Sequence, residues 1–416
     1  MERKVQTQMN KKFTTLQTKL LAACMLIYST AYFNRLNLSA ALGSMMEALN
    51  LSATVAGILP SAFAITYAAG QMVNGALVDR LNPVRHMQIG LIGSALCNLL
   101  LGLSSHFGML MAACLLNGCF QSMLWTPIVC LLAMNFDNES RPKANICVSL
   151  TLILGHLGAW ALSGYMSGIL SWRASFTVPA LLVVPVIPLS AWLFKDAHKT
   201  LAPAAHKSGE SEKTSMRDAM GIYWVSGFIL LLVVSVLYGF VRDGIRTWAP
   251  QILGEIGGNA VNATTITLLI PLINALGVIG SYALRRVPGL RNRRIVSLLM
   301  AAGTVFCGFL CGVSGMILCA LVMGVVCACM SGIDPIMTSL IPMEYDREKL
   351  IGLSAGLVDS FIYVGSALAG VLAGFIRESW GMDALFIGWA VAAAVGAVLA
   401  MVTDAMLSIY RARKVD

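Results

Sequence analysis

Charged residues are scarce in this sequence. They make up 12% of its 416 residues, against about 25% in soluble domains, while 57% of the residues are hydrophobic. The mean hydropathy is +0.77. This composition excludes an ordinary soluble globular domain, and it is typical of a polytopic membrane protein whose surface contacts membrane lipid.

Sequence patterns of enzymes and metal sites are missing as well. No Walker phosphate-binding loop occurs, and the eleven cysteines show no metal-ligand spacing. Most of these cysteines lie inside apolar stretches, where cysteine packs as a small hydrophobic residue. We therefore expect a protein that is not an enzyme and that holds no cofactor and no metal.

Long apolar stretches, by contrast, are abundant. A membrane-spanning helix needs about 20 apolar residues, and the sequence predicts twelve such helices in an all-α polytopic membrane protein. The glycine-rich part at 365–374 is expected to let one of them pack closely against a neighbour. The stretches run over residues 19–43, 55–78, 86–104, 107–135, 145–170, 175–194, 221–253, 263–284, 295–312, 314–342, 350–376 and 383–409.

The net charge of +9 is distributed unevenly along the chain. Most Lys and Arg residues fall at the termini and in alternate loops, so they lie on one side of the membrane if both termini lie together. Arg173 and Arg377 fall in loops of the other side. This is the positive-inside pattern of a protein with both termini in the cytoplasm, and it argues against a basic surface for nucleic acid.

One polar segment of mixed charge, residues 195–220, separates six apolar stretches from the other six. We predict an N-terminal six-helix bundle over 1–194, a cytoplasmic linker over 195–220 and a C-terminal six-helix bundle over 221–416. The KTSMRDAM part of the linker could instead form an ordered helix. This organisation resembles that of the major facilitator fold, in which substrate binds near the membrane midplane between the two halves.

A loop motif after the second apolar stretch agrees with that fold. Gly75, Asp79, Arg80 and Arg85 match the G-x-x-x-D-R-x-x-x-x-R loop of the major facilitator superfamily. The glycine allows close helix packing and the aspartate lies beside fixed positive charge, so these residues are predicted to form a conformational latch. The corresponding loop of the second half has Leu284 in place of the aspartate, which predicts a weak or absent latch there.

Two arginines lie inside apolar stretches. Arg35 and Arg242 each occupy the first stretch of one half. An arginine at the bilayer centre costs about 2.5–3.5 kcal/mol on insertion scales and remains charged, so it is tolerated where it faces a cavity and binds an anion. Their equivalent positions predict one anion site to which each half contributes an arginine.

Aromatic and titratable side chains accompany the arginines. Tyr28 and Tyr32 share one helical face with Arg35, and a phenol can donate a hydrogen bond to an anion. His156 can bind a proton near neutral pH, although a lone histidine in a membrane is often only a satisfied polar group. The other candidate ligands are Tyr67, Tyr363 and Trp125. For Tyr363 and Trp125, packing against neighbouring helices is an equal alternative.

These residues lie in runs that resemble the organophosphate:phosphate antiporter family of the major facilitator superfamily. The runs are TAYFNRLNLSAAL, the Asp79 loop with NPVR, NGCFQSMLWTPIV, GHLG and FVRDGIRTWAPQIL, and the resemblance covers nearly the whole chain. Members of that family carry glycerol 3-phosphate or hexose 6-phosphate in exchange for inorganic phosphate. The resemblance implies a monomer in a bacterial inner membrane, with a small organic anion and inorganic phosphate as its partners.

The resemblance also implies roles for particular residues. In that family an arginine of the first helix and one of the seventh clamp the phosphate, and Arg35 and Arg242 match them. A histidine of the fifth helix matches His156. The tyrosines of the first, second and eleventh helices match Tyr28, Tyr32, Tyr67 and Tyr363.

Three positions depart from the family pattern. Gln71 stands where characterised members carry a lysine, Asn274 where they carry a carboxylate, and Ile153 where they carry an asparagine. One positive and one negative charge are thus missing together, which suggests a lost ion pair and leaves Gln71 and Asn274 as polar candidates for the site. The preference for an anion is retained, whereas the preference for a sugar or glycerol phosphate does not transfer.

Four further charged residues of the second half, Asp243, Arg246, Asp334 and Asp359, are candidates for the site. Asp243 is expected to pair with Arg242 or with Arg246, and a second anion contact by Arg246 is the alternative. Asp334 and Asp359 lie within apolar stretches, where acids are candidates for function. Either one could carry a proton or bind a cationic group on an aminated or zwitterionic phosphate or phosphonate.

The sequence therefore predicts a secondary active transporter that exchanges an organic phosphate or phosphonate for inorganic phosphate by rocker-switch alternating access. Two guanidinium groups would bind the phosphate oxygens through charge-assisted hydrogen bonds. An empty site with two unneutralised positive charges would resist closure and so enforce exchange. An organic carboxylate:proton symporter of the same fold and a non-transporting membrane sensor of phosphorylated sugars are the alternatives, while a cationic clamp disfavours a drug exporter.

Overall fold

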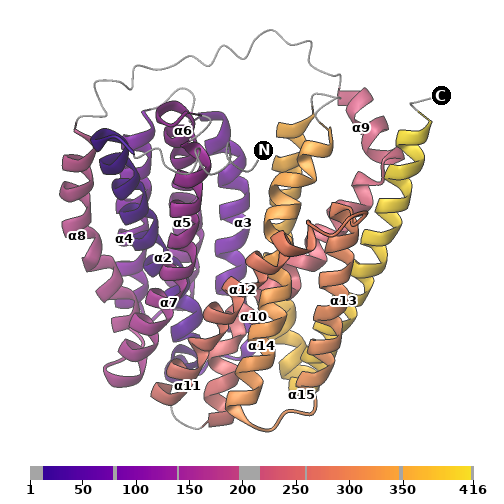
Figure 1. Ribbon diagram of the computed structural model, residues 1–416. Coiled ribbons are helices and arrows are strands. Elements are labelled where there is room, and N and C mark those ends of the chain that lie inside the picture. Colours follow the sequence, from indigo (N-terminus) through magenta and orange to yellow (C-terminus); the bar gives the residue numbers. More distant parts are fainter. Residues whose placement is uncertain are drawn as a thin grey trace. The chain divides into compact units, whose positions relative to one another are not determined.

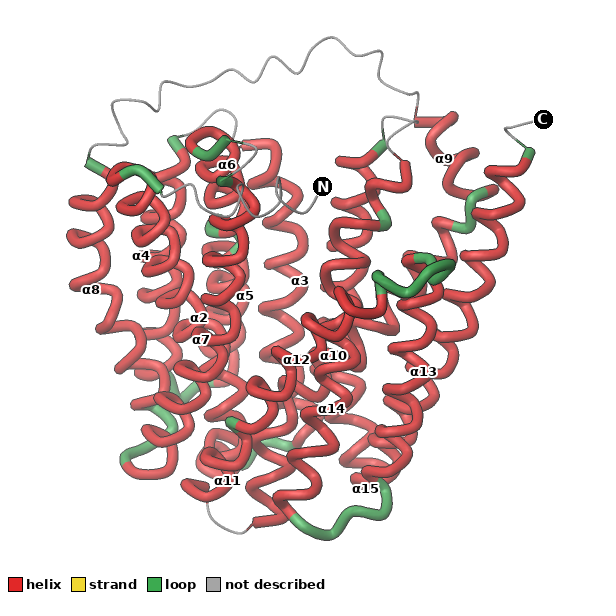
Figure 2. The backbone as a smooth tube through the Cα atoms, viewed as in Figure 1, coloured by secondary structure: helices red, strands yellow, loops and turns green. Residues whose placement is uncertain are grey.

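Helices form nearly all of the described chain (Figure 2). Among the residues that the structure describes, no strand occurs, which confirms the predicted all-α class. The structure is a computed structural model, and the residues it describes are 13–77, 82–137, 140–195, 216–257, 260–345 and 350–413.

Nine helical segments in the described ranges are long and apolar enough to cross a membrane. Eight of them correspond to one predicted stretch each. The ninth, Leu353–Ala412, covers the last two predicted stretches, which Gly381 separates because its φ of 86° is not helical. The predicted stretches at 19–43 and 145–170 form helices of 35 and 29 residues, which also exceed the length of about 20 residues that a span needs.

The chain divides into two compact units. The first consists of Met1–Leu38 and Ala69–Lys207, and the second of Ser39–Ala68 and Ser208–Asp416. The division therefore differs from the predicted bundles in one hairpin, residues 39–68, which packs with the second unit. The central part of the predicted linker, residues 196–215, lies outside the described residues.

The first unit contains a break that periodicity did not predict. The predicted stretch 107–135 is two helices, α5 and α6, joined by a turn at residues 122–124. Pro127 explains the break, because proline has no N–H for a helical bond to residue 123 and its ring collides with that turn. The helices of the unit (Figure 1) are the first part of α2 (Thr15–Leu49), the last part of α3 (Ala53–Leu77), α4 (Pro83–Leu103), α5 (Phe107–Gln121), α6 (Trp125–Asn135), α7 (Arg141–Ile169) and α8 (Ala174–Phe194).

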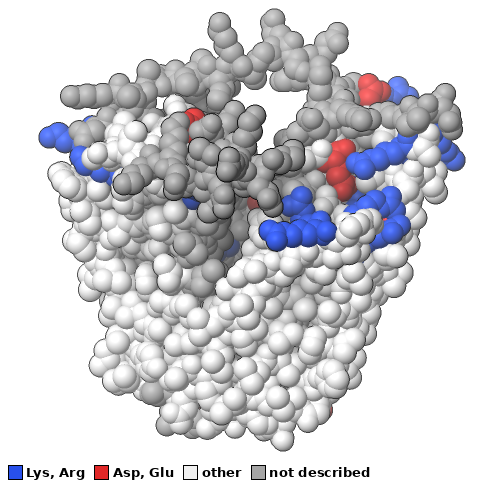
Figure 3. Space-filling model, in the orientation of Figure 1, with Lys and Arg blue, Asp and Glu red and all other residues white. Residues whose placement is uncertain are grey.

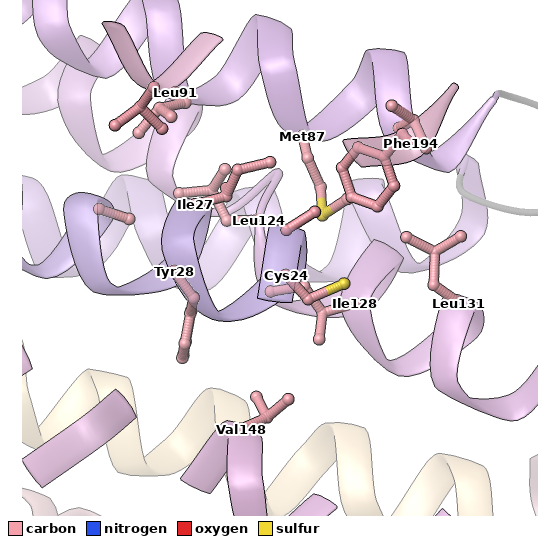
Figure 4. Close-up of a cluster of buried hydrophobic side chains, with 14 of the residues drawn as sticks. Cys24, Ile27, Tyr28, Met87, Leu91, Leu124, Ile128, Leu131, Val148 and Phe194 are labelled. Atoms are coloured by element: carbon pink, nitrogen blue, oxygen red, sulfur yellow. The ribbon is translucent and has the colours of Figure 1, made fainter. Parts of the chain in front are cut away.

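A cluster of buried apolar side chains joins helices α2, α4, α6, α7 and α8 of the first unit (Figure 4). Cys24 and Ile27 from α2, Met87 from α4, Ile128 from α6 and Phe194 from α8 have no exposed surface. In lipid such packing stabilises through close van der Waals contact rather than through removal from water. It fixes the rotation of α2, the helix that carries the first predicted arginine.

The second unit also shows two helix breaks at identifiable residues. The predicted stretch 221–253 begins too early, because Gly227 (φ 74°) turns the chain between α9 and α10. Helices α11 and α12 are separated at Leu268, where Pro271 cannot continue the backbone ladder. The elements of the unit are the remaining parts of α2 and α3, α9 (Met216–Val225), α10 (Phe228–Gly257), α11 (Ala260–Thr267), α12 (Leu269–Leu284), α13 (Asn292–Leu310), α14 (Met316–Pro335), the π-helix η2 (Ile336–Leu340), the 3₁₀-helix η3 (Pro342–Tyr345) and α15 (Ile351–Ala412).

The hairpin at residues 39–68 is bound to α10 and α15 within the second unit. Ser39 Oγ donates to the carbonyl oxygen of Arg246 at 2.7 Å, and the backbone N–H of Thr54 donates to Glu378 Oε2 at 2.9 Å. A Cβ atom added at Gly370 would collide with Ser61 and with the backbone of α3. This close approach confirms the packing expected for the glycine-rich part of α15.

Basic side chains gather at one end of the second unit, where α9 and the end of α15 lie (Figures 1 and 3). Arg291 and Arg294 there both bond Asp404 Oδ2, at 2.5 and 2.8 Å. Arg293 is fully buried and donates to Glu344 Oε2 at 3.0 Å. Ion pairs from α13, η3 and α15 therefore hold this end together, in the half where Leu284 replaces the aspartate of the loop motif.

Candidate functional site

Buried amide side chains hold the part of α2 around Arg35. Asn98 of α4 and Asn117 of α5 both donate to the carbonyl oxygen of Asn34, at 2.9 and 3.1 Å. Asn37 donates to Asn98 Oδ1 at 2.6 Å. All four amides are at most 4% exposed, and hydrogen bonds of this kind tie helices together in lipid. They fix the turn of α2 on which Arg35 lies.

Four of the predicted ligands come together in the first unit. The hydroxyl groups of Tyr28 and Tyr32 lie 3.5 Å apart, and both rings are buried. The ring of Trp125 lies 5.2 Å from that of Tyr28, and the ring of His156 lies 5.0 Å from that of Tyr32, between centroids. Arg35 is half-buried one turn beyond Tyr32 on the same helix.

Gly155 brings α7 close to α2 at this cluster. A Cβ atom at Gly155 would lie 2.8 Å from Cβ of Tyr32, which is closer than carbon atoms pack. The glycine before His156 is therefore what allows the imidazole to reach the ring of Tyr32.

Gln71 and Gly75 lie toward the C-terminal end of α3. Thr126 Oγ1 donates to Gln71 Oε1 at 3.3 Å, so Gln71 contacts the start of α6. Asp79 and Arg80 lie outside the described residues, and Arg85 is exposed in the first turn of α4. Gly75 lies in the last turns of α3. The latch stays a prediction.

Arg242 is the centre of a polar network in the second unit. It is 8% exposed, and its Nε and Nη2 donate to the two carboxylate oxygens of Asp243 at 2.9 and 2.8 Å. Its Nη1 donates to Asp334 Oδ1 at 2.7 Å and to the hydroxyl of Tyr238 at 3.1 Å. The predicted pairing of Asp243 with Arg242 is confirmed.

Arg246 extends the network along α10. Its Nη1 donates to Asp243 Oδ1 at 3.3 Å, so Asp243 pairs with both arginines. Its Nη2 donates to Ser331 Oγ at 3.2 Å, and Ser331 in turn donates to Asn274 Oδ1. Ser366 of α15 donates to Asp243 Oδ2.

The network is neutral in total, because it contains the two arginines Arg242 and Arg246 and the two aspartates Asp243 and Asp334. The expectation that an empty site leaves Arg242 unneutralised is therefore wrong for this arrangement. Two carboxylates already compensate the charge that burial makes costly. Any anion that binds Arg242 has to compete with them.

Sequence reasoning missed Tyr238, whose side chain has no exposed surface. Its hydroxyl donates to Asp334 Oδ1 at 2.5 Å, and the guanidinium carbon of Arg242 lies 5.0 Å from its ring centroid. The signal was present, because Tyr238 precedes Arg242 by four residues and so shares its helical face. The buried asparagines around Arg35 were also missed, although polar residues inside apolar stretches could have marked them.

The remaining predicted residues lie on α3 and α15 within the second unit. The rings of Tyr67 and Tyr363 lie 4.6 Å apart at an interplanar angle of 49°, and Tyr67 is 2% exposed. Asp359 is half-buried one turn before Tyr363. Helix α15 thus carries Tyr363 and also Ser366, the side chain that contacts Asp243.

Comparison with known proteins points to one family. The family model described as Major Facilitator Superfamily matches residues 24–344. The nucleoside transporter NupG, whose crystal structure is known, superimposes with a TM-score of 0.69, covering 93% of this chain and 98% of that one at 17% identity. This likeness confirms the predicted fold class of twelve transmembrane helices in two six-helix bundles.

Three curated relatives are similar over most of their length. A "Probable hexose phosphate transport protein" of Chlamydia pneumoniae is 23% identical over 96% of this chain and 93% of its own. The "Membrane sensor protein UhpC" of Escherichia coli strain K12 is 24% identical over 89% and 88%. The "Glycerol-3-phosphate transporter" of Bacillus subtilis strain 168 is 24% identical over 93% and 92%. The resemblance to the organophosphate:phosphate antiporters is thereby confirmed.

Proposed function

This chain belongs to the Major Facilitator Superfamily, and we propose that it is a secondary active transporter that exchanges an organic phosphate, or a related phosphonate, for inorganic phosphate. The observation that carries the proposal is Arg242, a guanidinium at 8% exposure inside a long apolar helix. A charge in that position is costly and marks a substrate or ion pathway. The names of the relatives supply the phosphate class.

In this proposal Arg35 and Arg242 bind the phosphate oxygens. A planar guanidinium offers paired N–H groups that match two oxygens of a phosphate. Tyr28 and Tyr32 would add hydroxyl donors, and His156, whose ring is tilted by 40° against that of Tyr32, would add an imidazole N–H. Gln71 and Asn274 would contact the organic part. That the two arginines share one site, and that rocker-switch motion moves it from one side to the other, are parts of the proposal.

The orientation of the chain in the membrane is inferred from its basic residues. We propose that both termini are cytoplasmic in a bacterial inner membrane, since most basic residues then lie inside. The working form is proposed to be a monomer.

A carboxylate symporter is the second candidate, and one observation favours it. Arg242 already binds two carboxylate groups, with two hydrogen bonds to Asp243 and one to Asp334. A site that accepts carboxylates from its own chain has the geometry to accept them from a ligand. The name of the UhpC relative keeps a sensor role as a further outcome.

Exchange of labelled inorganic phosphate in proteoliposomes loaded with unlabelled phosphate tests the proposal. Arg35→Lys and Arg242→Lys are each expected to lower the exchange rate at least about tenfold. Lysine keeps the charge but loses the paired donors, and a hydrogen bond to a charged group contributes about 1.5–3 kcal/mol. Arg173→Lys is the matched control, because Arg173 bonds Ser105 at 2.7 Å in a loop.

The outcomes separate the candidates. Wild-type exchange that only the Arg35 and Arg242 variants lose supports the antiporter. If folded wild type exchanges no phosphate but takes up labelled glucuronate under an imposed pH gradient, the carboxylate symporter replaces it. Binding of phosphate esters without any exchange would indicate a sensor.

A further inference from the structure

The guanidinium group of Arg242 is already engaged by its own chain. An arginine side chain has five N–H groups, and four hydrogen bonds run from this one to Asp243, Asp334 and Tyr238. A phosphate or carboxylate that binds in bidentate fashion needs two parallel N–H groups. An incoming anion can therefore bind Arg242 in this way only after one of the present acceptors leaves.

Asp334 is the acceptor that can leave. Asp243 is the residue next to Arg242 on α10 and also accepts from Arg246 and Ser366. In the described part of the chain, the hydrogen bonds found for the Asp334 carboxylate both reach Oδ1, from Arg242 and Tyr238. The side chain of Asp334 is 33% exposed, against 19% for Asp243.

The helix type changes directly after Asp334. Helix α14 ends at Pro335 and the π-helical turn η2 begins at Ile336. Thr338 Oγ1 donates to the carbonyl oxygen of Asp334 at 2.8 Å. Single π-helical turns are common at functional sites. The carboxylate that would leave Arg242 thus lies where α14 meets a π-helical turn.

A carboxylate that leaves Arg242 inside the membrane would become an unpaired negative charge, which is strongly disfavoured. We propose that Asp334 takes up a proton from solution when an anion binds Arg242, so that a proton is bound together with each anion. The proton adds to a carboxylate oxygen of Asp334 and returns to solution when the anion leaves. One negative charge enters with the anion and one is removed by the proton, so the network keeps its balance.

This inference rests on the proposed function and adds a coupling ion to it. In exchange, protons would move with both anions, and in net uptake a proton gradient would drive accumulation. The side chains that share the hydrogen-bond network of Asp334 are Tyr238, Arg242, Asp243 and Arg246 from α10, Asn274 from α12, Ser331 from α14 and Ser366 from α15, the helix that also carries Asp359 and Tyr363.

The test measures binding of inorganic phosphate to the purified full-length protein by titration calorimetry in buffers of different ionisation enthalpy, at several pH values. These data give the number of protons taken up per phosphate and the affinity at each pH. Wild type and Asp334→Asn are compared under identical conditions, so that the titration of phosphate itself cancels. Asp218→Asn is the matched control, because Asp218 is an exposed aspartate on α9.

We expect wild type and Asp218→Asn to take up as much as one proton more per phosphate than Asp334→Asn. The affinity of wild type should fall by up to about tenfold per pH unit above the midpoint of its profile, the slope for one linked proton. Asp334→Asn should lose this additional pH dependence and bind more tightly at high pH, because a neutral amide competes weakly for Arg242.

Equal proton uptake and equal pH profiles in wild type and Asp334→Asn would overturn the inference and leave the proposed function standing. A wild type that binds no phosphate would overturn both. Tyr238→Phe serves as the second variant if Asp334→Asn does not fold. This variant removes one hydrogen-bond donor to the Asp334 carboxylate, so the carboxylate should still bind the proton. The pH profile of phosphate affinity should move to higher pH, because the ionised carboxylate is less stabilised. A profile that does not move counts against the inference.

Discussion

Arg35 and Arg242 are held by different kinds of neighbour. Around Arg242 the partners are charged, with Asp243 and Asp334 at hydrogen-bonding distance. Around Arg35 the helix backbone is held by amides, which bond the carbonyl oxygen of Asn34 from two other helices. A charged partner lowers the cost of burial but competes with substrate, and amides that bond the backbone hold the helix turn from which the side chain extends.

The amide network leads to a prediction at the scale of single residues. Asn98→Ala removes donors to Asn34 O and Ser94 O and the acceptor of Asn37. Because buried polar groups lose their partners, we expect the free energy of unfolding to fall by about 1–3 kcal/mol. The melting temperature in detergent micelles measures the change.

Phosphate binding by Asn98→Ala should weaken as well, since α2 is then free to shift the guanidinium of Arg35. Met109→Ala, at an exposed position in α5, provides the control and should melt close to wild type. An Asn98→Ala protein that melts and binds as wild type does would show that the amides do not position α2.

Helices in both units approach one another at glycines that lie next to predicted ligands. A Cβ atom at Gly239 would collide with the carbonyl oxygen of Ile362, and one at Gly365 with that of Val236. These contacts bring α10 and α15 together beside Tyr238 and Ser366. Gly155 does the same for α7 and α2 beside Tyr32. Glycine thus sets the distances between the helices that carry the candidate site.

Gly155→Ala provides a prediction at the scale of the helices. The added methyl group would lie 2.8 Å from Cβ of Tyr32, so α7 has to move away and His156 loses its contact with the Tyr32 ring. Overpacking of this kind costs about 1–3 kcal/mol, and we expect phosphate affinity to fall at least several-fold. Gly308→Ala is the control, because an added Cβ meets nothing within 4 Å there.

Calorimetric affinity and the melting temperature should be measured on both glycine variants. Similar affinity in Gly155→Ala and Gly308→Ala would mean that the contact between His156 and Tyr32 does not matter for binding. A lower affinity in Gly155→Ala alone would place α7 among the helices that determine it.

For the whole molecule, the sequence predicted the helices better than their interactions. Apolar length was enough to locate the spans, and proline or glycine, as at Pro127 and Gly227, explains where a span is broken. The site was predicted in part, since Arg242 and Asp243 do pair. The role of Asp334 as a partner of Arg242 could not be read from the sequence, because 92 residues separate them and periodicity within one helix carries no information on contacts between helices.

The arrangement across the membrane leads to the last prediction. If the basic residues lie inside, a green fluorescent protein fused to the C-terminus should fluoresce in a bacterial host, and alkaline phosphatase fused there should be inactive. Both reporters respond to the side of the membrane, since the first matures in the cytoplasm and the second needs the oxidising periplasm to form its disulfides. The control is alkaline phosphatase fused after Trp172, in the loop with Arg173, which should be active. Active phosphatase at the C-terminus would contradict the positive-inside assignment and would place the ion pairs around Arg293 on the outer side.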